Sequence, residues 1–181
     1  MDFTVLGDVP RATGYAFELV DREVEAPDGT RFSRNLIRHV GAVAVLPVDD
    51  EGMVHLLRQY RASFDRFMLE MPAGLRDIDH EDLEVAARRE LEEEVGLRAN
   101  ELVFLGCVAN SSGFTDQLTW LYLGLGLTAV AAAPDGVEER FIERCTMSLE
   151  ELLGYSDPHG SDVTLLLAAH LAKQHLSQRG A

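Results

Sequence analysis

The hydrophobic positions between residues 83 and 95 repeat at the spacing of an amphipathic helix, about 3.6 residues per turn. The apolar stripe consists of Leu83, Ala87, Leu91 and Val95. Asp77 and Asp79 can cap the start of a helix, and Gly96 suits a left-handed stop just after its last turn. The pattern therefore predicts a helix from about His80 to Val95.

Continuous or loosely alternating apolar runs predict strands along most of the remaining chain. The run 41–48 (GAVAVLPV) is apolar throughout, which is typical of a strand buried on both faces. Further strands are expected at 53–57, 102–108, 118–127 and 140–147. Near the N-terminus, residues 15–24 and 31–40 flank the turn signal Pro27-Asp28-Gly29, which indicates a hairpin or a small antiparallel sheet.

Two helices are expected towards the C-terminus. Ser148 and Glu151 have capping-box spacing for a short helix that ends near Leu153. Residues 162–177 form an amphipathic pattern. Its inward positions are Leu165, Ala168, Ala169, Leu171 and Ala172.

Composition narrows the class of protein. The 181 residues, 46% of them hydrophobic, suffice for one ordinary core, and the formal charge of −15 disfavours partners such as nucleic acid or an anionic membrane. Cys107 and Cys145 are too few for a disulfide framework, which favours idle thiols in a reducing compartment. With neither an apolar leader nor a run near 18 apolar residues, we expect a cytoplasmic protein.

Acidic residues gather at the edge of the apolar stripe of the 83–95 helix. Glu90, Glu93 and Glu94 fall beside the stripe, where crowded like charges are costly without a cation. Because hard divalent ions take oxygen ligands, these carboxylates are candidate metal ligands. The alternative is an ordinary surface helix on which Arg88 and Arg89 pair with the glutamates.

Residues 89–97 (RELEEEVGL) resemble the second half of the Nudix box, REUxEExGU, where U is aliphatic. The upstream Gly and Glu of the box correspond to Gly74 and Glu81, with six residues between them instead of the usual five. The resemblance implies an α/β (α+β) Nudix fold, a mixed β-sheet sandwiched between helices, over residues 41–181 with the box at 74–97. It also implies that Glu90, Glu93 and Glu94 are metal ligands and that Arg89 orients these carboxylates.

Two further segments are similar to the ADP-ribose pyrophosphatase and ADP-sugar diphosphatase branch of that family. Residues 58–61 read RQYR, and residues 67–74 resemble its LE-x-PAG lead-in. The resemblance implies that Arg58 and Arg61 clamp phosphates, although exposed arginines at a strand end are the simpler alternative. It further implies that Glu70 joins the metal cluster or orients Arg61, and that the carbonyl of Ala73 is a metal ligand.

Two loops carry additional candidates. The 110–117 loop matches the branch at Gly113, Phe114, Thr115 and Asp116, but has Ser112 and Gln117 where a proline and a glutamate are usual. These residues either contact substrate or form a plain turn. In the 131–139 loop the resemblance implies that Glu138, or else Glu139, activates water, whereas acidic loop tips in general serve solubility.

The activity implied by the resemblance is Mg²⁺-dependent hydrolysis of a nucleoside diphosphate linked to X, with Mn²⁺ able to substitute and two or three ions bound. ADP-ribose, cleaved to AMP and ribose 5-phosphate, is the leading substrate. The layout of residues 1–40 implies a β-rich extension used for homodimerisation and for gripping the nucleoside; the partners are a small-molecule nucleotide and a second copy of the chain. Open alternatives are another nucleotide-sugar pyrophosphatase acting on GDP-mannose or a UDP-sugar, a housecleaning hydrolase of damaged nucleoside triphosphates, and a non-catalytic sensor on the same fold.

Overall fold

The chain divides by its internal contacts into two units. The structure, a computed structural model, describes residues 2–132 and 139–179. The first unit comprises residues 1–41 together with 109–118, and the second comprises residues 42–108 together with 119–181. The loop at 110–117 thus groups with the N-terminal strands.

The first unit is built on a three-stranded antiparallel sheet in the order β1-β2-β3. Its strands are β1 (Thr4–Thr13), β2 (Phe17–Glu25) and β3 (Arg31–His39). The turn between β2 and β3 places Gly29 at φ 83° and lets the Asp28 carboxylate accept a hydrogen bond from the amide of Thr30. The N-terminal antiparallel sheet is confirmed.

Strand β1 was not predicted from the sequence. Its register with β2 shifts between Val5 and Gly7 and again between Pro10 and Ala12. Such irregularities break the period-two alternation by which a strand is detected. Glycine and proline within the segment also weaken the strand signal.

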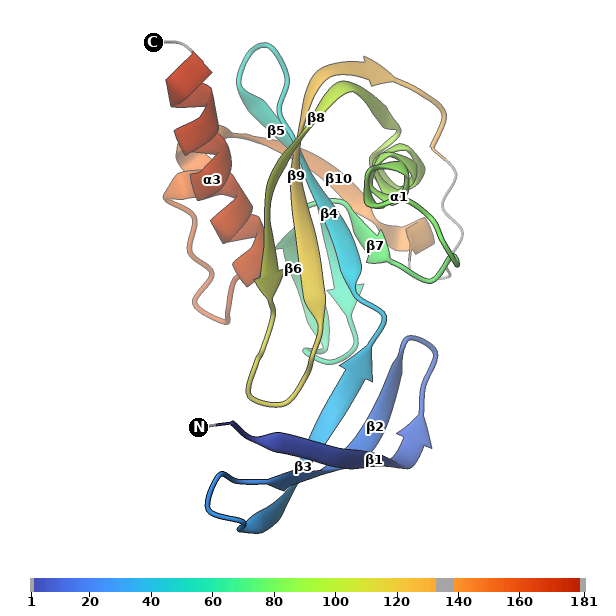
Figure 1. Cartoon of the computed structure of the whole chain (residues 1–181). Coiled ribbons are helices and arrows are strands. Elements are labelled where there is room, and N and C mark those ends of the chain that lie inside the picture. The colour runs from blue at the N-terminus through green and yellow to red at the C-terminus, as the bar shows by residue number, and fades with distance from the viewer. Residues whose placement is uncertain (1, 133–138, 180–181) are drawn as a thin grey trace. The chain divides into compact units, whose positions relative to one another are not determined.

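The second unit contains two sheets (Figure 1). The four-stranded sheet has the order β7-β4-β9-β8, and its strands are β4 (Ala42–Pro47), β7 (Ala73–Leu75), β8 (Leu97–Ala109) and β9 (Leu118–Ala129). Strand β4 pairs parallel with β9 and antiparallel with β7, so this sheet is mixed. The three-stranded sheet has the order β10-β5-β6, from β5 (Met53–Arg61), β6 (Arg66–Glu70) and β10 (Glu143–Ser148).

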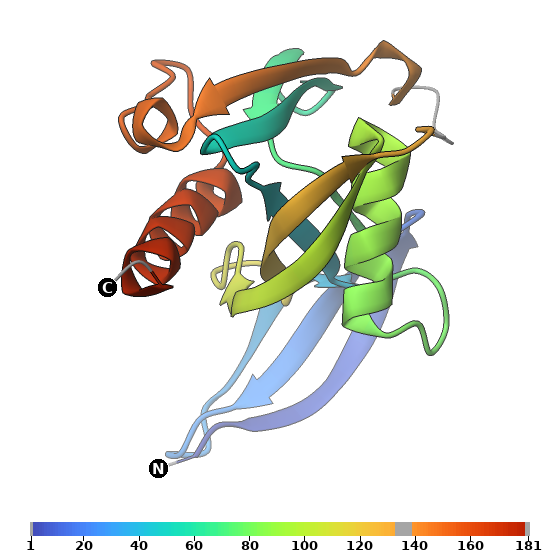
Figure 2. The same cartoon turned by 90° about the horizontal axis from the view of Figure 1, so that it is seen from above.

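Helices cover both faces of the mixed sheet. Figures 1 and 2 show α1 (Leu83–Glu90) and α3 (Val163–Arg179) on opposite sides of strands β4 and β9. A π-helical turn, η1 (Leu91–Val95), continues α1, and the remaining elements are a 3₁₀ turn, η2 (Glu139–Phe141), and α2 (Leu149–Leu153). The expected mixed sheet between helices is confirmed.

Strand β4 belongs to two separate apolar clusters, one on each face. Ala44 and Leu46 pack in the cluster that includes Leu165 and Ala168 of α3. Val43 and Val45 pack with the cluster that includes Leu91. The prediction of a strand buried on both faces is therefore confirmed, and β4 fixes α1 and its carboxylates to the sheet.

The helix that carries the acidic cluster begins later than predicted and ends where it was predicted to end. It begins after Asp82, whose side chain accepts a hydrogen bond from the amide of Glu84 at 2.8 Å. His80 has φ 63°, which is incompatible with a right-handed helix, so the predicted start at His80 is wrong. After Glu90 the helix widens into the π turn, and Gly96 ends it at φ 70° as predicted.

Two other sequence expectations have plain outcomes. The capping box of Ser148 and Glu151 at α2 is confirmed. Both cysteines are free thiols, and burial raises the pKa of Cys145. Within residues 2–132 and 139–179, no helix combines the length and the apolarity needed to cross a bilayer.

Candidate active site

The Glu90 carboxylate lies against the backbone of Gly74. A methyl group added at Gly74 would come within 2.0 Å of Cδ of Glu90. Glu90 is only 9% exposed, so this close approach occurs in a nearly closed space. Glycine at position 74 therefore has a steric function, because any Cβ there would displace the carboxylate.

The Glu94 carboxylate meets the same short segment of chain. Its Oε2 accepts a hydrogen bond from the amide of Ala73 at 2.9 Å, and the residue is 5% exposed. Glu90 and Glu94 thus converge on the two consecutive residues Ala73 and Gly74, which begin β7. The preceding residue is tied to strand β4, since the Pro72 carbonyl accepts from the amide of Val45 at 2.9 Å.

Arg89 contacts three carboxylates around this point. Its guanidinium lies 2.6 Å from Glu90 Oε1, donates to Glu93 at 3.0 Å and donates twice to Glu81 at 3.2 Å. These partners raise the pKa of Arg89 above its ordinary value, with the hydrogen bonds to Glu81 as the largest cause. Arg88, in contrast, pairs with Glu84 at 2.7 Å on the exposed side of α1.

Arg61 and Glu70 form a second charged pair next to the acidic helix. Arg61 Nε donates to both oxygens of Glu70, at 2.8 and 3.1 Å, and its Nη2 completes a fork-like contact. Glu70 is 7% exposed. The hydrogen bonds to Glu70 raise the pKa of Arg61, and the charges of Glu94 and Asp162 act in the same direction. Arg61 therefore lies within electrostatic reach of a carboxylate on the helix.

The donor set fits a hard divalent cation. Three carboxylates of Glu90, Glu93 and Glu94 face Arg89 and the Ala73–Gly74 segment, and carboxylate oxygens are the groups that Mg²⁺ prefers. Across residues 2–132 and 139–179, no three acidic, histidine or cysteine side chains are arranged as a ready-made metal cluster. Arg89 now neutralises Glu90 and Glu93, so a bound cation would compete with that guanidinium for the same oxygens.

The remaining candidates are distributed as follows. Arg58 is half exposed, and its nearest acidic partner is Glu143 at 3.8 Å. In the first unit, Asp116 accepts from the amide of His39 at 2.9 Å and pairs with Arg38 at 3.1 Å. Phe114 and Thr115 join the same loop to β3 through Ile37, with Phe114 54% exposed. These contacts show how the loop is held; a role for Gly113–Asp116 in binding substrate stays a prediction.

The two candidates for a general base are not placed by the structure. Glu138 lies outside the described residues. Glu139 begins η2, but its side chain is outside the described part as well. Both assignments remain predictions.

Two contacts near the site were not found from the sequence. Arg144 of β10 reaches the backbone carbonyl of Glu94 at 2.9 Å. Arg76 lies over the ring of Trp120 at 4.5 Å, next to the lead-in loop. Arg144 and Arg76 are isolated basic residues in their segments, and a single arginine gives no periodicity or motif by which such a role could be detected.

Comparison with known proteins supplies independent findings. The model of the NUDIX domain matches residues 38–167. The methanol dehydrogenase activator of Bacillus methanolicus is 35% identical over 143 residues, covering 79% of this chain and 77% of that protein. The ADP-ribose pyrophosphatase of Bacillus subtilis (strain 168) is 35% identical over 141 residues, covering 78% and 76%. A crystal structure of an ADP compounds hydrolase shares the fold with a TM-score of 0.84 at 23% identity, over 99% of this chain and 97% of that one.

Proposed function

The chain belongs to the NUDIX family and is a Nudix hydrolase, and we propose that it hydrolyses the diphosphate bond of ADP-ribose to give AMP and ribose 5-phosphate. The observation that carries the proposal is the convergence of Glu90 and Glu94 on Ala73 and Gly74, beside Arg61. A diphosphate needs its charge neutralised and a water aligned with phosphorus, which the arginines together with cations held by the carboxylates would supply. The ADP-ribose pyrophosphatase of Bacillus subtilis supports the choice of substrate.

Glu90, Glu93, Glu94 and the Ala73 carbonyl would hold two or three Mg²⁺ ions, for which Mn²⁺ can substitute. When bound, such ions neutralise the phosphate oxygens and lower the pKa of water. Arg89 then keeps Glu90 and Glu93 oriented through the contacts described above.

Other residues of this chain act on the substrate. Glu70 orients Arg61, which binds a phosphate through the N–H groups of its guanidinium that do not contact Glu70. Arg58, on the same strand, provides a second positive charge. Glu138 or Glu139 accepts the proton of the attacking water. The water oxygen bonds to one phosphorus, the bond from that phosphorus to the bridging oxygen breaks, and the second phosphate leaves with the bridging oxygen.

The first unit supplies the nucleoside grip in this proposal. A cavity of about 410 Å³ in that unit is lined in part by Tyr15, Phe17, Arg38 and His39. Tyr15 is 88% exposed, so its ring is accessible for stacking on a base. Burial lowers the pKa of His39, which favours a neutral imidazole there.

The first unit also supports homodimerisation. Val20 is the sole fully buried hydrophobic side chain among this unit's described residues, whereas Val5, Leu6 and Val9 of β1 are each 45–56% exposed. An open strand edge with apolar side chains is costly in water. We therefore expect a second copy of the chain to cover β1.

The proposed function is tested with a substrate panel. Purified protein is incubated with Mg²⁺ and ADP-ribose, GDP-mannose, UDP-glucose, 8-oxo-dGTP or a diadenosine polyphosphate, and products are identified by mass spectrometry. ADP-ribose should give the highest kcat/KM, with AMP and ribose 5-phosphate as products and no turnover in EDTA. A higher kcat/KM for another nucleotide sugar would contradict ADP-ribose as the substrate. Tight binding without turnover would favour a sensor.

Reaction in ¹⁸O-labelled water identifies the phosphorus that is attacked. Label in AMP places the attack on the adenosine-side phosphorus, and label in ribose 5-phosphate places it on the other.

A further inference from the structure

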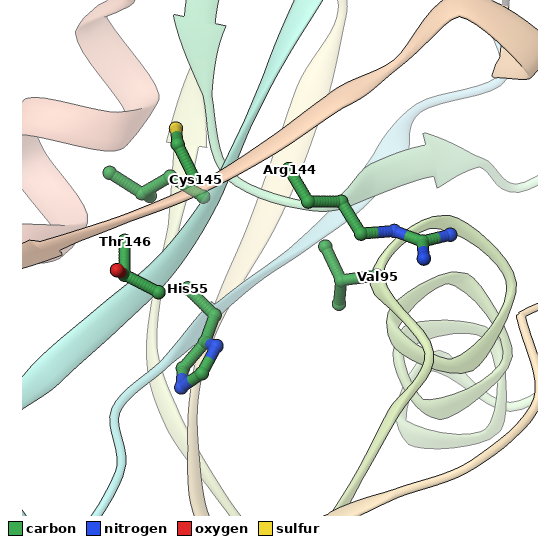
Figure 3. A pocket seen from close by; sticks show the side chains of 6 residues that line it. His55, Val95, Arg144, Cys145 and Thr146 are labelled. Atoms are coloured by element: carbon green, nitrogen blue, oxygen red, sulfur yellow. The ribbon is translucent and has the colours of Figure 1, made fainter.

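Arg144 connects β10 to the end of the acidic helix. Its Nε donates a hydrogen bond to the backbone carbonyl of Glu94 at 2.9 Å, across 50 positions of sequence. Figure 3 shows the Arg144 side chain extending from β10 towards the helix, with Val95 beside it. Cys145, the next residue, packs with the apolar cluster that contains α3.

The carbonyl that Arg144 contacts is at a helix end, where backbone oxygens lack intrahelical donors. The amide of Gly96 donates hydrogen bonds to the carbonyls of Leu91 and Glu92. Arg144, from the three-stranded sheet, brings a charged donor to the carbonyl of Glu94. A cation near the C-terminal end of a helix is also favoured by the helix dipole. The π turn is therefore held by β10 at the residue whose side chain enters the site.

Glu94 is consequently fixed at two points. Arg144 holds its backbone oxygen, and the amide of Ala73 holds its carboxylate. We propose that Arg144 is a positioning residue that sets the Glu94 carboxylate for metal binding, an inference that rests on the proposed function above. In this role Arg144 acts through Glu94 and not as a ligand or a substrate contact.

The surroundings of Arg144 permit a clean substitution. A cavity of about 180 Å³ lies beside it, lined in part by His55, Val95 and Thr146. His55 is held by Asp49 at 3.0 Å and stays in place without Arg144. A shorter polar side chain at position 144 leaves space that water can fill, so the fold should tolerate Arg144→Gln.

The experiment compares wild-type protein with Arg144→Gln and Arg144→Lys by three measurements. Hydrogen exchange without metal should quicken about fivefold at Val95 and Gly96 in Arg144→Gln, because one hydrogen bond is lost at the helix end. Mn²⁺ binding, followed by electron paramagnetic resonance without substrate, should weaken about tenfold or more. In turnover assays the Mg²⁺ midpoint should rise while KM for the nucleotide at saturating Mg²⁺ stays unchanged, and Arg144→Lys should restore part of each effect.

Arg98→Gln is the matched control. Arg98 also lies just after the helix, but pairs with Glu92 at 2.8 and 3.0 Å and is more than half exposed, so the same charge is removed without touching Glu94. Arg98→Gln should bind Mn²⁺ like the wild type.

The outcomes separate this inference from the proposed function. Equal Mn²⁺ affinity in wild type and Arg144→Gln overturns the positioning role and leaves the hydrolase proposal standing. Weaker Mn²⁺ binding in Arg144→Gln, in a protein that cleaves no member of the substrate panel, supports the positioning role and overturns the proposed function. A wild-type protein that binds no Mn²⁺ overturns both.

Discussion

At the scale of single residues, the candidate site depends on contacts that a sequence pattern only partly reveals. The spacing of Glu90 and Glu94 was readable, because residues four apart lie on one face of a helix. Their common target, the Ala73–Gly74 segment, depends on tertiary structure. Arg89 pairs with Glu81, Glu90 and Glu93. The arginine–glutamate pairing expected of an ordinary surface helix therefore involves two of the glutamates that are also candidate metal ligands.

Gly74→Ala should impair catalysis without unfolding the protein. The new Cβ would lie 2.0 Å from Glu90 Cδ, so the carboxylate must move. A shift of a candidate ligand should lower kcat/KM by about 10–100-fold, in the range seen when support of a metal ligand is lost. Gly154→Ala is the control, because the nearest heavy atom to its Cβ is 3.7 Å away. Equal activity of the two variants would contradict the role of Gly74.

Glu94→Gln should remove most turnover and leave the fold intact. The glutamine oxygen can still accept from the amide of Ala73, while the negative charge needed by a cation is lost. We expect kcat to fall by more than the roughly 10–100-fold typical of groups that only support a ligand. Glu92→Gln, which affects an acid paired with Arg98, should retain near-normal kcat. A near-normal rate for Glu94→Gln would refute its assignment as a ligand.

At the scale of elements, α1 and η1 illustrate what a sequence pattern conveys and what it does not. The apolar stripe was right, since Ala87, Leu91 and Val95 are all at most 8% exposed. The π turn was not predicted, because the apolar spacing over residues 83–95 matches an ordinary helix and gives no sign of i→i+5 hydrogen bonds. The helix start was misplaced because Asp77, Asp79 and Asp82 are all competent caps, and only the last is used.

The strand predicted at 53–57 is present but ends later than predicted. Strand β5 continues through the RQYR segment to Arg61, beyond the apolar run that marked its start. Pairing with β6 sustains it there, with Arg61 opposite Arg66. Such cross-strand support is invisible in a local window of sequence.

Gly96→Ala should destabilise the end of the acidic helix. A non-glycine residue in the left-handed region costs about 1–2 kcal/mol, and the new Cβ would also lie 3.0 Å from the Val130 carbonyl oxygen. By that cost alone, the melting temperature should fall by about 2–8 °C. Gly52→Ala, at φ 78° with nothing within 4 Å, carries the same backbone cost without the collision. Differential scanning calorimetry should therefore show the larger loss for Gly96→Ala, and equal losses would remove the collision from the explanation.

At the scale of the whole molecule, most of the apolar interior lies in the second unit. Both core clusters are formed by that unit, whereas the first unit exposes much of its apolar surface along β1. The formal charge of −15 on the whole chain opposes the approach of a polyanionic nucleotide. Arginines placed at the carboxylate cluster, such as Arg61 and Arg89, offset that field locally.

Val9→Lys should dissociate the proposed homodimer. Val9 is 47% exposed on β1, and a buried lysine without a partner is costly at an apolar interface. Light scattering coupled to size exclusion should give the mass of a dimer for the wild type and of a monomer for the variant. Val163→Lys, at a 60% exposed position that begins α3, should leave the mass unchanged. A monomeric wild type at micromolar concentration would exclude this mode of assembly.

The hydrogen bond between the Ala73 amide and Glu94 gives the protein a spectroscopic reporter of its own. An amide proton donated to a carboxylate resonates downfield, and it shifts back when that oxygen is engaged elsewhere. A nuclear magnetic resonance titration with a divalent cation, followed at this one backbone signal, can thus record cation binding in the absence of nucleotide.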